Sequence, residues 1–276
     1  MVVESMQRDN CIFVQISDLH ICKKGTYFNE VFDTTAALEH CIDSINKLHP
    51  IPDFVLATGD LANEPNAESY KIIHQKLQKL NMPVFVMPGN HDDRKELCSE
   101  FEDAYYLNIS NSFLSYCIDK YPLRLIALDS LNAATGEGEV CQKRLDWLEK
   151  KLLEEPTKPT LLAMHHQPIF TRLGSHGQKY AFDGAKELEE LLAYHSQVLW
   201  ITCGHLHRQI IFCFGKIPVT VAPSATCIRT LTMDNSMPKE LINEPPGYLL
   251  FIWEQKAGII CHNNVVGNFN QRHQLL

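Results

Sequence analysis

Short apolar runs alternate with longer amphipathic stretches over residues 11–203. The apolar runs are rich in β-branched and aromatic residues, and most are apolar on both faces, as the central strands of a covered sheet are. They predict strands at 11–17, 54–57, 84–87, 123–128, 160–164 and 198–203. The stretches between them predict helices at 31–48, 67–80, 94–103, 142–153 and 185–194. This βαβαβ order indicates a layered α/β fold.

The pattern changes after residue 207. Four further runs predict sequential strands with short turns at 208–214, 217–222, 248–253 and 258–262. Gly215-Lys216 predicts a hairpin turn between the first two. We therefore expect an antiparallel second sheet packed on the first, with helices outside both. Residues 231–246 hold three prolines and predict an exposed loop. We expect one domain over residues 1–276, in which residues from about 229 to 276 form a loop followed by late strands.

Polar clusters directly follow five of the predicted strands. Because the carboxyl ends of strands in an open α/β sheet face one crevice, these clusters should converge there without being close in sequence. They are Asp18-Leu19-His20, Thr58-Gly59-Asp60, Gly89-Asn90-His91-Asp92, His165-His166 and Gly204-His205-Leu206-His207.

The residue types in these clusters are those of a metal site. Carboxylate and imidazole together are ligands typical of Mn, Fe or Zn, and the lack of cysteine among them argues against a closed structural zinc site. In Asp18-x-His20 and His205-x-His207, an extended backbone would point both side chains the same way. Gly59, Gly89 and Gly204 would let the chain turn sharply beside the ions. Each motif alone also occurs as a turn or a helix cap, but all five after strands favour a metal centre.

Composition narrows the partners. The chain has 276 residues, of which 45% are hydrophobic, and a formal net charge of −8, so we expect no long nucleic acid as a partner. No apolar run reaches the ~18 residues that span a bilayer, and residues 1–10 lack the apolar region of a secretory signal. The ten cysteines form no C-x-x-C pair, which favours free thiols. We expect a cytoplasmic protein without a membrane partner; its oligomeric state stays open, a homo-oligomer included.

The five clusters resemble the five signature blocks of the calcineurin-like metallophosphoesterases, over at least residues 11–228. Asp129-Ser130, Gly138-Glu139 and Pro223-Ser224 with Cys227 are also similar to a subgroup, the bacterial class III cyclic-nucleotide phosphodiesterases of the CpdA type. The resemblance implies a four-layer sandwich of two mixed β-sheets flanked by helices. It also implies two divalent metal ions per chain, with Mn, Fe or Zn as the candidates.

The same resemblance implies a role for each matching position. One ion would be held by Asp18, His20, Asp60 and His207, and the other by Asp60, Asn90, His165 and His205, so that Asp60 bridges the two. His91 would be a non-ligand histidine beside the scissile phosphate and, with Asn90, catalytic. The residues expected to contact the substrate are His20, Asn90, His91 and His207.

The expected reaction is hydrolysis of a small phosphodiester by metal-bound hydroxide, with 3′,5′-cyclic AMP opened to 5′-AMP as the leading substrate. The alternatives are a glycerophosphodiester, a 2′,3′-cyclic nucleotide or a lipid-linked pyrophosphate. A non-catalytic scaffold with this fold would lack ligands, whereas all seven are present.

Five neighbouring residues have roles that the sequence assigns less directly. We expect Asp92 to cap the following helix rather than to orient a histidine. His166 either touches the substrate or packs. Arg94, Arg229 and His176 could contact phosphate or base, but the interpretation we adopt for each is a solvated surface residue.

Overall fold

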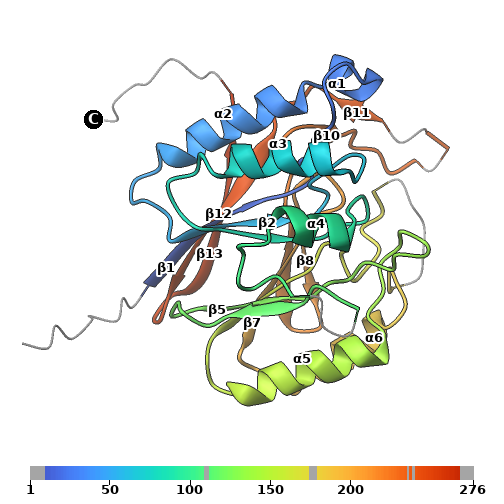
Figure 1. Ribbon diagram of the computed structural model, residues 1–276. Helices are drawn as coiled ribbons and strands as arrows, with labels where there is room; N and C mark the ends of the chain where they lie inside the picture. Colours follow the sequence, from blue (N-terminus) through green and yellow to red (C-terminus); the bar gives the residue numbers. More distant parts are fainter. Residues whose placement is uncertain (1–9, 109–111, 174–178, 235, 238–239, 268–276) are drawn as a thin grey trace, which may run out of the picture.

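Two β-sheets pack face to face, and helices cover the outer face of each (Figure 1). This computed structural model describes residues 10–108, 112–173, 179–234, 236–237 and 240–267. Helices α2 (Thr34–Asn46) and α3 (Ala67–Leu77) lie on one side of the sheets, and α5 (Gln142–Glu154) and α6 (Ala185–Leu192) on the other. The expected four-layer sandwich is confirmed.

The first sheet has the order β13-β12-β1-β2-β3. Strands β1 (Asn10–Ile16), β2 (Phe54–Thr58) and β3 (Val84–Met87) are parallel to one another. Strands β12 (Gly247–Glu254) and β13 (Gly258–Val265) are antiparallel to their neighbours and complete a mixed sheet. Parallel neighbours place the ends of β1, β2 and β3 at one edge.

The second sheet has the order β4-β5-β6-β7-β9-β8. Strands β5 (Arg124–Ala127), β6 (Thr160–Ala163), β7 (Val198–Cys203) and β9 (Ile217–Val221) are parallel, whereas β4 (Tyr116–Ile118) and β8 (Ile210–Phe214) are antiparallel edges. The remaining elements are helices α1 (Tyr27–Val31) and α4 (Arg94–Glu100) and a small ladder of β10 (Ile228–Arg229) with β11 (Leu241–Ile242).

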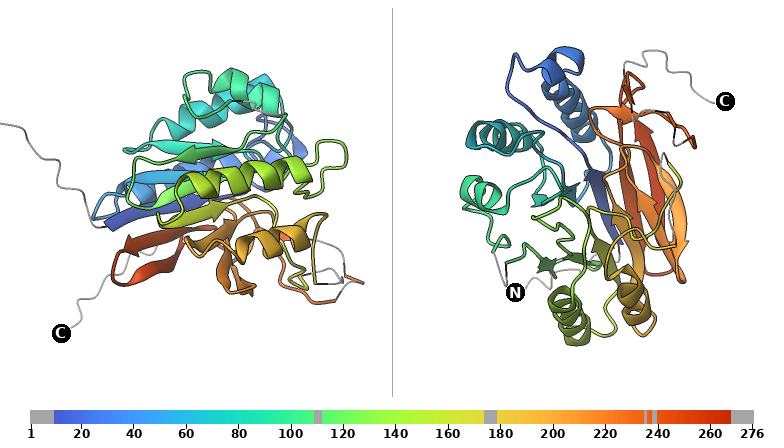
Figure 2. Two further views of the ribbon diagram at one scale, coloured as in Figure 1. Left: turned by 90° about the horizontal axis from the view of Figure 1, so that it is seen from below. Right: turned by 90° about the vertical axis from the view of Figure 1, so that its right-hand side faces the viewer.

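Alternating residues of each strand enter different cores. Phe13 of β1 stacks on Phe54 and Phe251 between the two sheets, with ring centroids 5.0 and 4.7 Å apart. Val14, one residue later, faces the cluster under α2 and α3. The period of two that lets one strand serve both cores also explains why the central strands read as continuous apolar runs. The two sheets are thereby held together through the shared core. Figure 2 shows the layers from two further directions.

The prediction that the chain's second half forms an antiparallel second sheet is wrong. Strands β12 and β13 join the first sheet, where β12 pairs with β1, and β9 lies parallel to β7 in the second. The hairpin of β8 and β9 at Gly215 is present. A local apolar pattern identifies a strand but not its neighbour, because the partner edge is set by the whole sheet.

Three local expectations also need correction. The helix expected at 31–48 is interrupted: α1 ends at Val31, and Asp33 caps α2 by accepting a 3.0 Å hydrogen bond from Ala36 N. The loop expected at 231–246 contains β11, and β4 was not predicted. Within the described part of the chain, every helix is too short or too polar to span a bilayer.

Candidate metal centre

The carboxyl ends of five strands meet at one edge of the packed sheets. Each strand ends two or three residues before the first of these polar side chains, and the side chains converge. They are Asp18 and His20 after β1, Asp60 after β2, Asn90 and His91 after β3, His165 after β6, and His205 and His207 after β7. The structure therefore brings together the seven candidate ligands and His91.

Asp18, His20, Asp60 and His207 form a first group, whose potential ligand atoms all lie within 4.8 Å of one another. His20 Nε2 lies 3.0 Å from His207 Nε2 and 3.6 Å from Asp60 Oδ2. His207 Nε2 lies 3.5 Å from Asp18 Oδ1. All four residues are at most 9% exposed.

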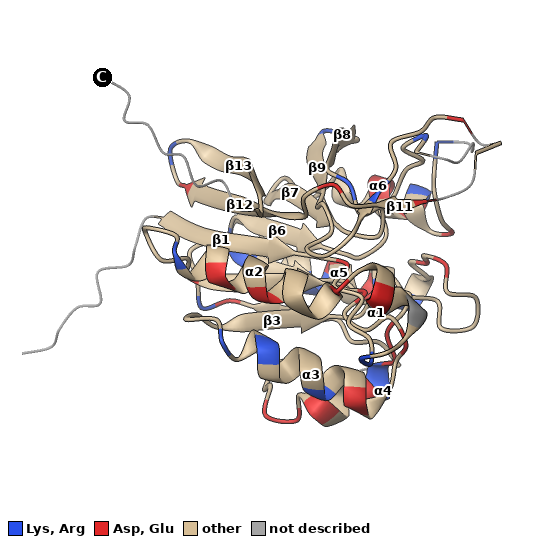
Figure 3. Cartoon of the chain, turned by 90° about the horizontal axis from the view of Figure 1, so that it is seen from above, with Lys and Arg blue, Asp and Glu red and all other residues tan. Residues whose placement is uncertain are grey.

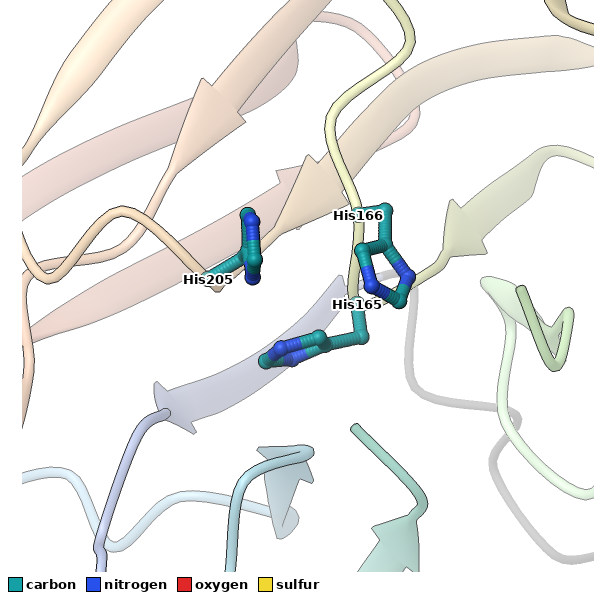
Figure 4. A group of neighbouring side chains, drawn as sticks. All are labelled: His165, His166 and His205. Carbon is teal, nitrogen blue, oxygen red and sulfur yellow. The ribbon is translucent and has the colours of Figure 1, made fainter. Parts of the chain in front are cut away.

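Asn90, His165 and His205 form a second group on the other side of Asp60. His165 Nε2 lies 3.1 Å from Asn90 Oδ1 and 3.4 Å from Asp60 Oδ1, and His205 Nδ1 lies 2.8 Å from Asn90 Oδ1. Figure 4 shows the rings of His165 and His205 close to each other, with His166 beside them. Because Asp60 turns Oδ2 to the first group and Oδ1 to the second, it lies between two positions where a cation fits.

The orientation of the imidazoles tests whether cations fit here. His165 Nδ1 donates to Thr58 O at 2.7 Å and His207 Nδ1 donates to Cys227 O at 2.9 Å. In the neutral rings, Nε2 of both histidines then carries a lone pair that points at a carboxylate. Buried acceptors that face one another are stable only with a cation between them. The donor set thus fits two metal ions, one in each group.

The pKa values in the metal-free chain reflect the same arrangement. Burial alone would lower the pKa of His165 and His207, but the charges of Asp60 and Asp18 respectively outweigh it and raise both pKa values to about 9. Burial lowers the pKa of His20 and of His205 to about 3. The raised pKa values of His165 and His207 therefore reflect the two buried carboxylates, Asp60 and Asp18, that a metal ion would otherwise balance.

The backbone around the ligands is not extended, contrary to our expectation. Asp18, His20, Asp60, His205 and His207 all have positive φ, between 43 and 72°. Both strands end before the motifs, so the paired side chains converge because each residue turns in the left-handed region, not because the strand period aligns them. This conformation is uncommon for residues with a Cβ, and it occurs mainly where the surrounding structure enforces it.

Two glycines make the close approach of the loops feasible. A Cβ on Gly89 would collide with N and Oδ1 of Asp60, and a Cβ on Gly59 would lie 2.6 Å from His165 Nδ1. Only Gly59 has a left-handed φ, at 88°. Gly89 is therefore required for lack of a side chain rather than for its backbone angle.

His91 lies at the open side of the site. Its backbone N–H donates to Asp60 Oδ1 at 2.8 Å, and its ring packs edge-on to His20 with centroids 4.8 Å apart. His91 Nδ1 donates to Asn63 O at 3.0 Å. Because the residue is exposed and Nδ1 is used, Nε2 is available to a ligand in the site.

Contrary to our expectation, Asp92 does not cap the following helix. Its neighbour Asp93 does so, by accepting hydrogen bonds from Lys95 N and Glu96 N. Asp92 is buried and accepts from Gly89 N, Leu61 N, Ala62 N and Tyr70 Oη, at 2.8 to 3.2 Å. It therefore ties the loop that carries Asp60 to the loop that carries Asn90. Burial and the charge of Asp60 raise its pKa to about 6, against the lowering by these backbone bonds.

His166 is buried beside the second group. Its backbone N–H donates to Ser130 Oγ, which lies 2.9 Å from His166 Nδ1. Among the described residues, Nε2 of His166 has no hydrogen-bond partner. The ring of His166 packs against those of His165 and His205, with centroids 5.0 and 4.8 Å away, and the potential ligand atoms of the three lie within 4.8 Å of one another.

Arg94 is not the solvated residue that we expected. It donates to the fully buried Asp129 through Nε at 2.5 Å and Nη2 at 2.9 Å, and to Leu131 O at 2.6 Å. Arg229 is half-buried, and burial lowers its pKa. His176 lies outside the described residues.

Sequence reasoning assigned no role to Ser224 and Thr226. Their hydroxyls hydrogen-bond to carbonyl oxygens of the turn that carries Asp18 and His20. The only signal was the similarity of Pro223-Ser224 and Cys227 to a subgroup, because hydroxyls that bond to backbone leave no periodic pattern.

The family can now be identified. The profile of the calcineurin-like phosphoesterases matches residues 12–209, which include all five clusters and both ligand groups. The chain belongs to this family, whose members use a dinuclear divalent metal centre and hydrolyse phosphoric esters. The resemblance noted in the sequence is confirmed.

Two relatives show which branches of the family are similar. The chain is 36% identical over 258 residues to a probable glycerophosphodiester phosphodiesterase GpdQ from Arcobacter nitrofigilis, covering 94% of both chains. It is 27% identical over 216 residues to the 3′,5′-cyclic adenosine monophosphate phosphodiesterase CpdA of Escherichia coli K12, covering 78% of this chain and 76% of the relative.

A solved structure supports the fold alone. A dimetal phosphatase from Danio rerio superposes with a TM-score of 0.60 at 12% identity, covering 93% of this chain and 99% of the other. At such low identity the likeness extends to the arrangement of sheets and helices only.

Proposed function

We propose that the protein is a dinuclear metal-dependent phosphodiesterase for small organic phosphodiesters. One ion would be held by Asp18, His20, Asp60 and His207, and the other by Asp60, Asn90, His165 and His205. The observation that carries the proposal is that the two carboxylate oxygens of Asp60 face different ligand groups: Oδ2 faces the group of His20, and Oδ1 faces the group of His165. The oxygen and imidazole donors suit Mn, Fe or Zn.

When bound, two divalent ions would supply positive charge for the substrate phosphate and acidify a water nucleophile. The chain's own residues do the rest. Asn90 and His91 stand on the same loop after β3 and face the same opening. Asn90 holds its amide oxygen toward His165 and His205, which orients its side chain toward the place where a phosphoryl group would lie.

His91 is the proposed proton donor to the leaving oxygen. A sugar or glycerol alkoxide leaves poorly unless it is protonated, so a general acid is needed. The bond from Nδ1 to Asn63 O fixes the tautomer and the ring, and leaves Nε2 to carry the second proton. The contact of its backbone N–H with Asp60 Oδ1 fixes the distance between this ring and both ligand groups.

For the substrate, we favour a glycerophosphodiester over 3′,5′-cyclic AMP. The GpdQ-named relative is more similar and covers more of the chain than the CpdA-named one. Cyclic AMP, the leading substrate from sequence, stays the second candidate because the CpdA-named relative covers 78% of this chain. In Figure 3, α2 carries acidic residues without Lys or Arg and α3 carries both signs, so these helices present no basic stripe for a long polyanion.

The test is a side-by-side assay of the Mn²⁺-reconstituted protein. Glycerophosphoethanolamine, 3′,5′-cyclic AMP and a 2′,3′-cyclic nucleotide are compared by kcat/KM, with Asn90→Ala as the control that removes a candidate ligand. We expect the glycerophosphodiester to be preferred and Asn90→Ala to lose most turnover. A clear preference for cyclic AMP would reverse our ranking, and no hydrolysis of any diester by a protein that holds two ions would contradict the proposal.

A further inference from the structure

Residues 222–227, between β9 and β10, lie against the turn that carries Asp18 and His20. Two hydroxyls of this segment donate to backbone carbonyls of the turn. Ser224 Oγ donates to Asp18 O at 2.7 Å. Thr226 Oγ1 lies 3.2 Å from Asp18 O and 3.0 Å from Leu19 O. A backbone bond from Ala225 N to Ser17 O, at 3.0 Å, completes the contact.

The segment holds its own hydroxyls in place. Ser224 Oγ accepts from Thr226 N at 3.1 Å and from Cys227 N at 2.9 Å, so its hydrogen is directed outward to Asp18 O. Ser224 is fully buried and Thr226 is 8% exposed. With two donors on one side, the hydroxyl hydrogen of Ser224 has its shortest acceptor in Asp18 O, since Thr226 Oγ1 and Cys227 Sγ lie farther away, at 3.4 and 3.8 Å.

The same segment also reaches the fourth residue of the first group. Cys227 O accepts from His207 Nδ1 at 2.9 Å, which aims His207 Nε2 at His20 and Asp18. No hydrogen bond among the described residues joins residues 222–227 to a side chain of Asn90, His165 or His205. The direct contacts of the segment are therefore with the first ligand group, and its link to the second group runs through Asp18, whose carboxylate accepts from His205 N at 3.0 and 3.1 Å.

The turn needs such support. Asp18, His20 and His207 all have positive φ, a conformation that residues with a Cβ adopt only when surrounding contacts over-determine it. The backbone carbonyls of Asp18 and Leu19 are buried, and without the hydroxyls of Ser224 and Thr226 they would lose these hydrogen-bond donors. The hydroxyls thus influence the backbone conformation from which the side chains of Asp18 and His20 project into the site.

We propose that Ser224 and Thr226 are positioning residues that preorganise the site of Asp18, His20, Asp60 and His207, and that they govern the affinity of this one ion. This inference rests on the proposed function, because it needs two ions to be bound. A purely structural role of the hydroxyls would lower stability and leave the relative affinity of the two ions unchanged.

The test uses Thr226→Val, which keeps the shape and removes the hydroxyl, and Thr226→Ser, which restores it. The control is Thr160→Val, a buried threonine at the start of β6 whose hydroxyl donates to Lys158 O at 2.8 Å, at the opposite end of the strand from His165. Mn²⁺ is titrated into each metal-free protein by calorimetry, and the number of ions and both dissociation constants are recorded, together with thermal unfolding.

We expect two ions in the wild type and, in Thr226→Val, about a tenfold rise in one dissociation constant with the other within about twofold. Thr226→Ser and Thr160→Val should bind both ions like the wild type. If Thr226→Val fails to fold, Ser224→Ala takes its place with the same expectation. Equal weakening of both ions, unchanged binding in Thr226→Val, or no rescue by Thr226→Ser would overturn the inference. A wild type that binds no Mn²⁺ would contradict the proposed function itself.

Discussion

At the scale of single residues, Gly89 lies where the loop that carries Asn90 passes the backbone of Asp60. Its φ is not in the left-handed region, so any penalty for Gly89→Ala comes from the collision of the new Cβ with N and Oδ1 of Asp60. We expect a loss of about 1–3 kcal/mol in the free energy of unfolding, as for overpacking of a core. Mn²⁺ affinity should fall with it, because Asp60 faces both ligand groups. Urea denaturation and Mn²⁺ titration measure the two effects.

Gly136→Ala is the matched control for this prediction. Gly136 has φ of 73° and no atom of the described residues within 4 Å of an added Cβ, so the substitution brings conformational strain of about 1 kcal/mol without a collision among them. Its Mn²⁺ affinity should equal that of the wild type. If Gly89→Ala also binds both ions unchanged, the crowding between the two loops has no bearing on the metal centre.

Substitution of His91 should lower the catalytic rate without affecting the binding of the metal ions. His91→Ala removes the proposed proton donor but none of the candidate ligands, so both ions should stay bound. We expect kcat to fall by about 10²–10⁴-fold with an alkyl leaving group. With a p-nitrophenyl diester, whose leaving group needs no protonation, the loss should be much smaller. Equal losses on both substrates would remove His91 from the role of general acid.

Residue types and their place after strands were enough to predict which side chains would meet, and the seven candidate ligands do meet. The way they meet could not be predicted, because a positive φ at Asp18 or His205 is imposed by contacts with residues far away in sequence. Asp92 shows the same limit. Its side chain was assigned to the nearest helix, whereas it accepts from Leu61 N and Ala62 N, about 30 residues earlier.

At the scale of elements, strand identity was predictable and strand neighbours were not. The runs that became β12 and β13 were predicted as strands, but β12 covers the free edge of β1, more than 230 residues earlier in the chain. The break between α1 and α2 had a local signal that we overlooked, an Asp33-Thr34 pair suited to start a helix.

The tie between α4 and the second sheet gives a prediction at this scale. Asp129, after β5, is fully buried and accepts from Arg94 and from the backbone N–H groups of Leu114 and Leu131. Asp129→Ala leaves these donors unpaired, and Arg94 is only 12% exposed. Breaking a buried pair by removing one partner costs about 3–5 kcal/mol, and we expect the lower end because Arg94 retains some solvent. Urea denaturation measures the loss.

A surface pair supplies the contrast. Glu39 accepts hydrogen bonds from Lys76 and Lys79, which hold its pKa at about 2. The side chains of Glu39 and Lys79 are exposed and that of Lys76 is partly exposed, so Glu39→Ala should cost less than about 1 kcal/mol. Comparable losses in the two variants would mean that Asp129 contributes no more than an exposed ion pair.

At the scale of the whole molecule, the metal centre joins the two sheets, because Asp18, Asp60 and Asn90 follow strands of the first and His165, His205 and His207 follow strands of the second. Ions bound there should stabilise the folded state as a whole. At a free Mn²⁺ concentration 100 times the dissociation constant, each site contributes about 2.7 kcal/mol by linkage. For a chain of this size, that corresponds to a rise in melting temperature of roughly 5 °C per site.

Removing the metal with a chelator and adding it back therefore tests the metal centre and the stability of the two-sheet fold in one experiment. The chelator-treated protein should melt at a lower temperature than the Mn²⁺-loaded protein, and adding Mn²⁺ back should restore the difference. Asp60→Asn should lose most of the shift, because its carboxylate faces both ion positions, whereas Glu39→Ala should keep all of it. Among the candidate ligands of the metal-free protein, five have positive φ and two are buried carboxylates, Asp18 and Asp60. This strain is therefore present before any ion binds, and the bound ions offset it. Equal melting temperatures with and without Mn²⁺ would mean that the folded protein binds no ion at that concentration, and would contradict the proposed metal centre.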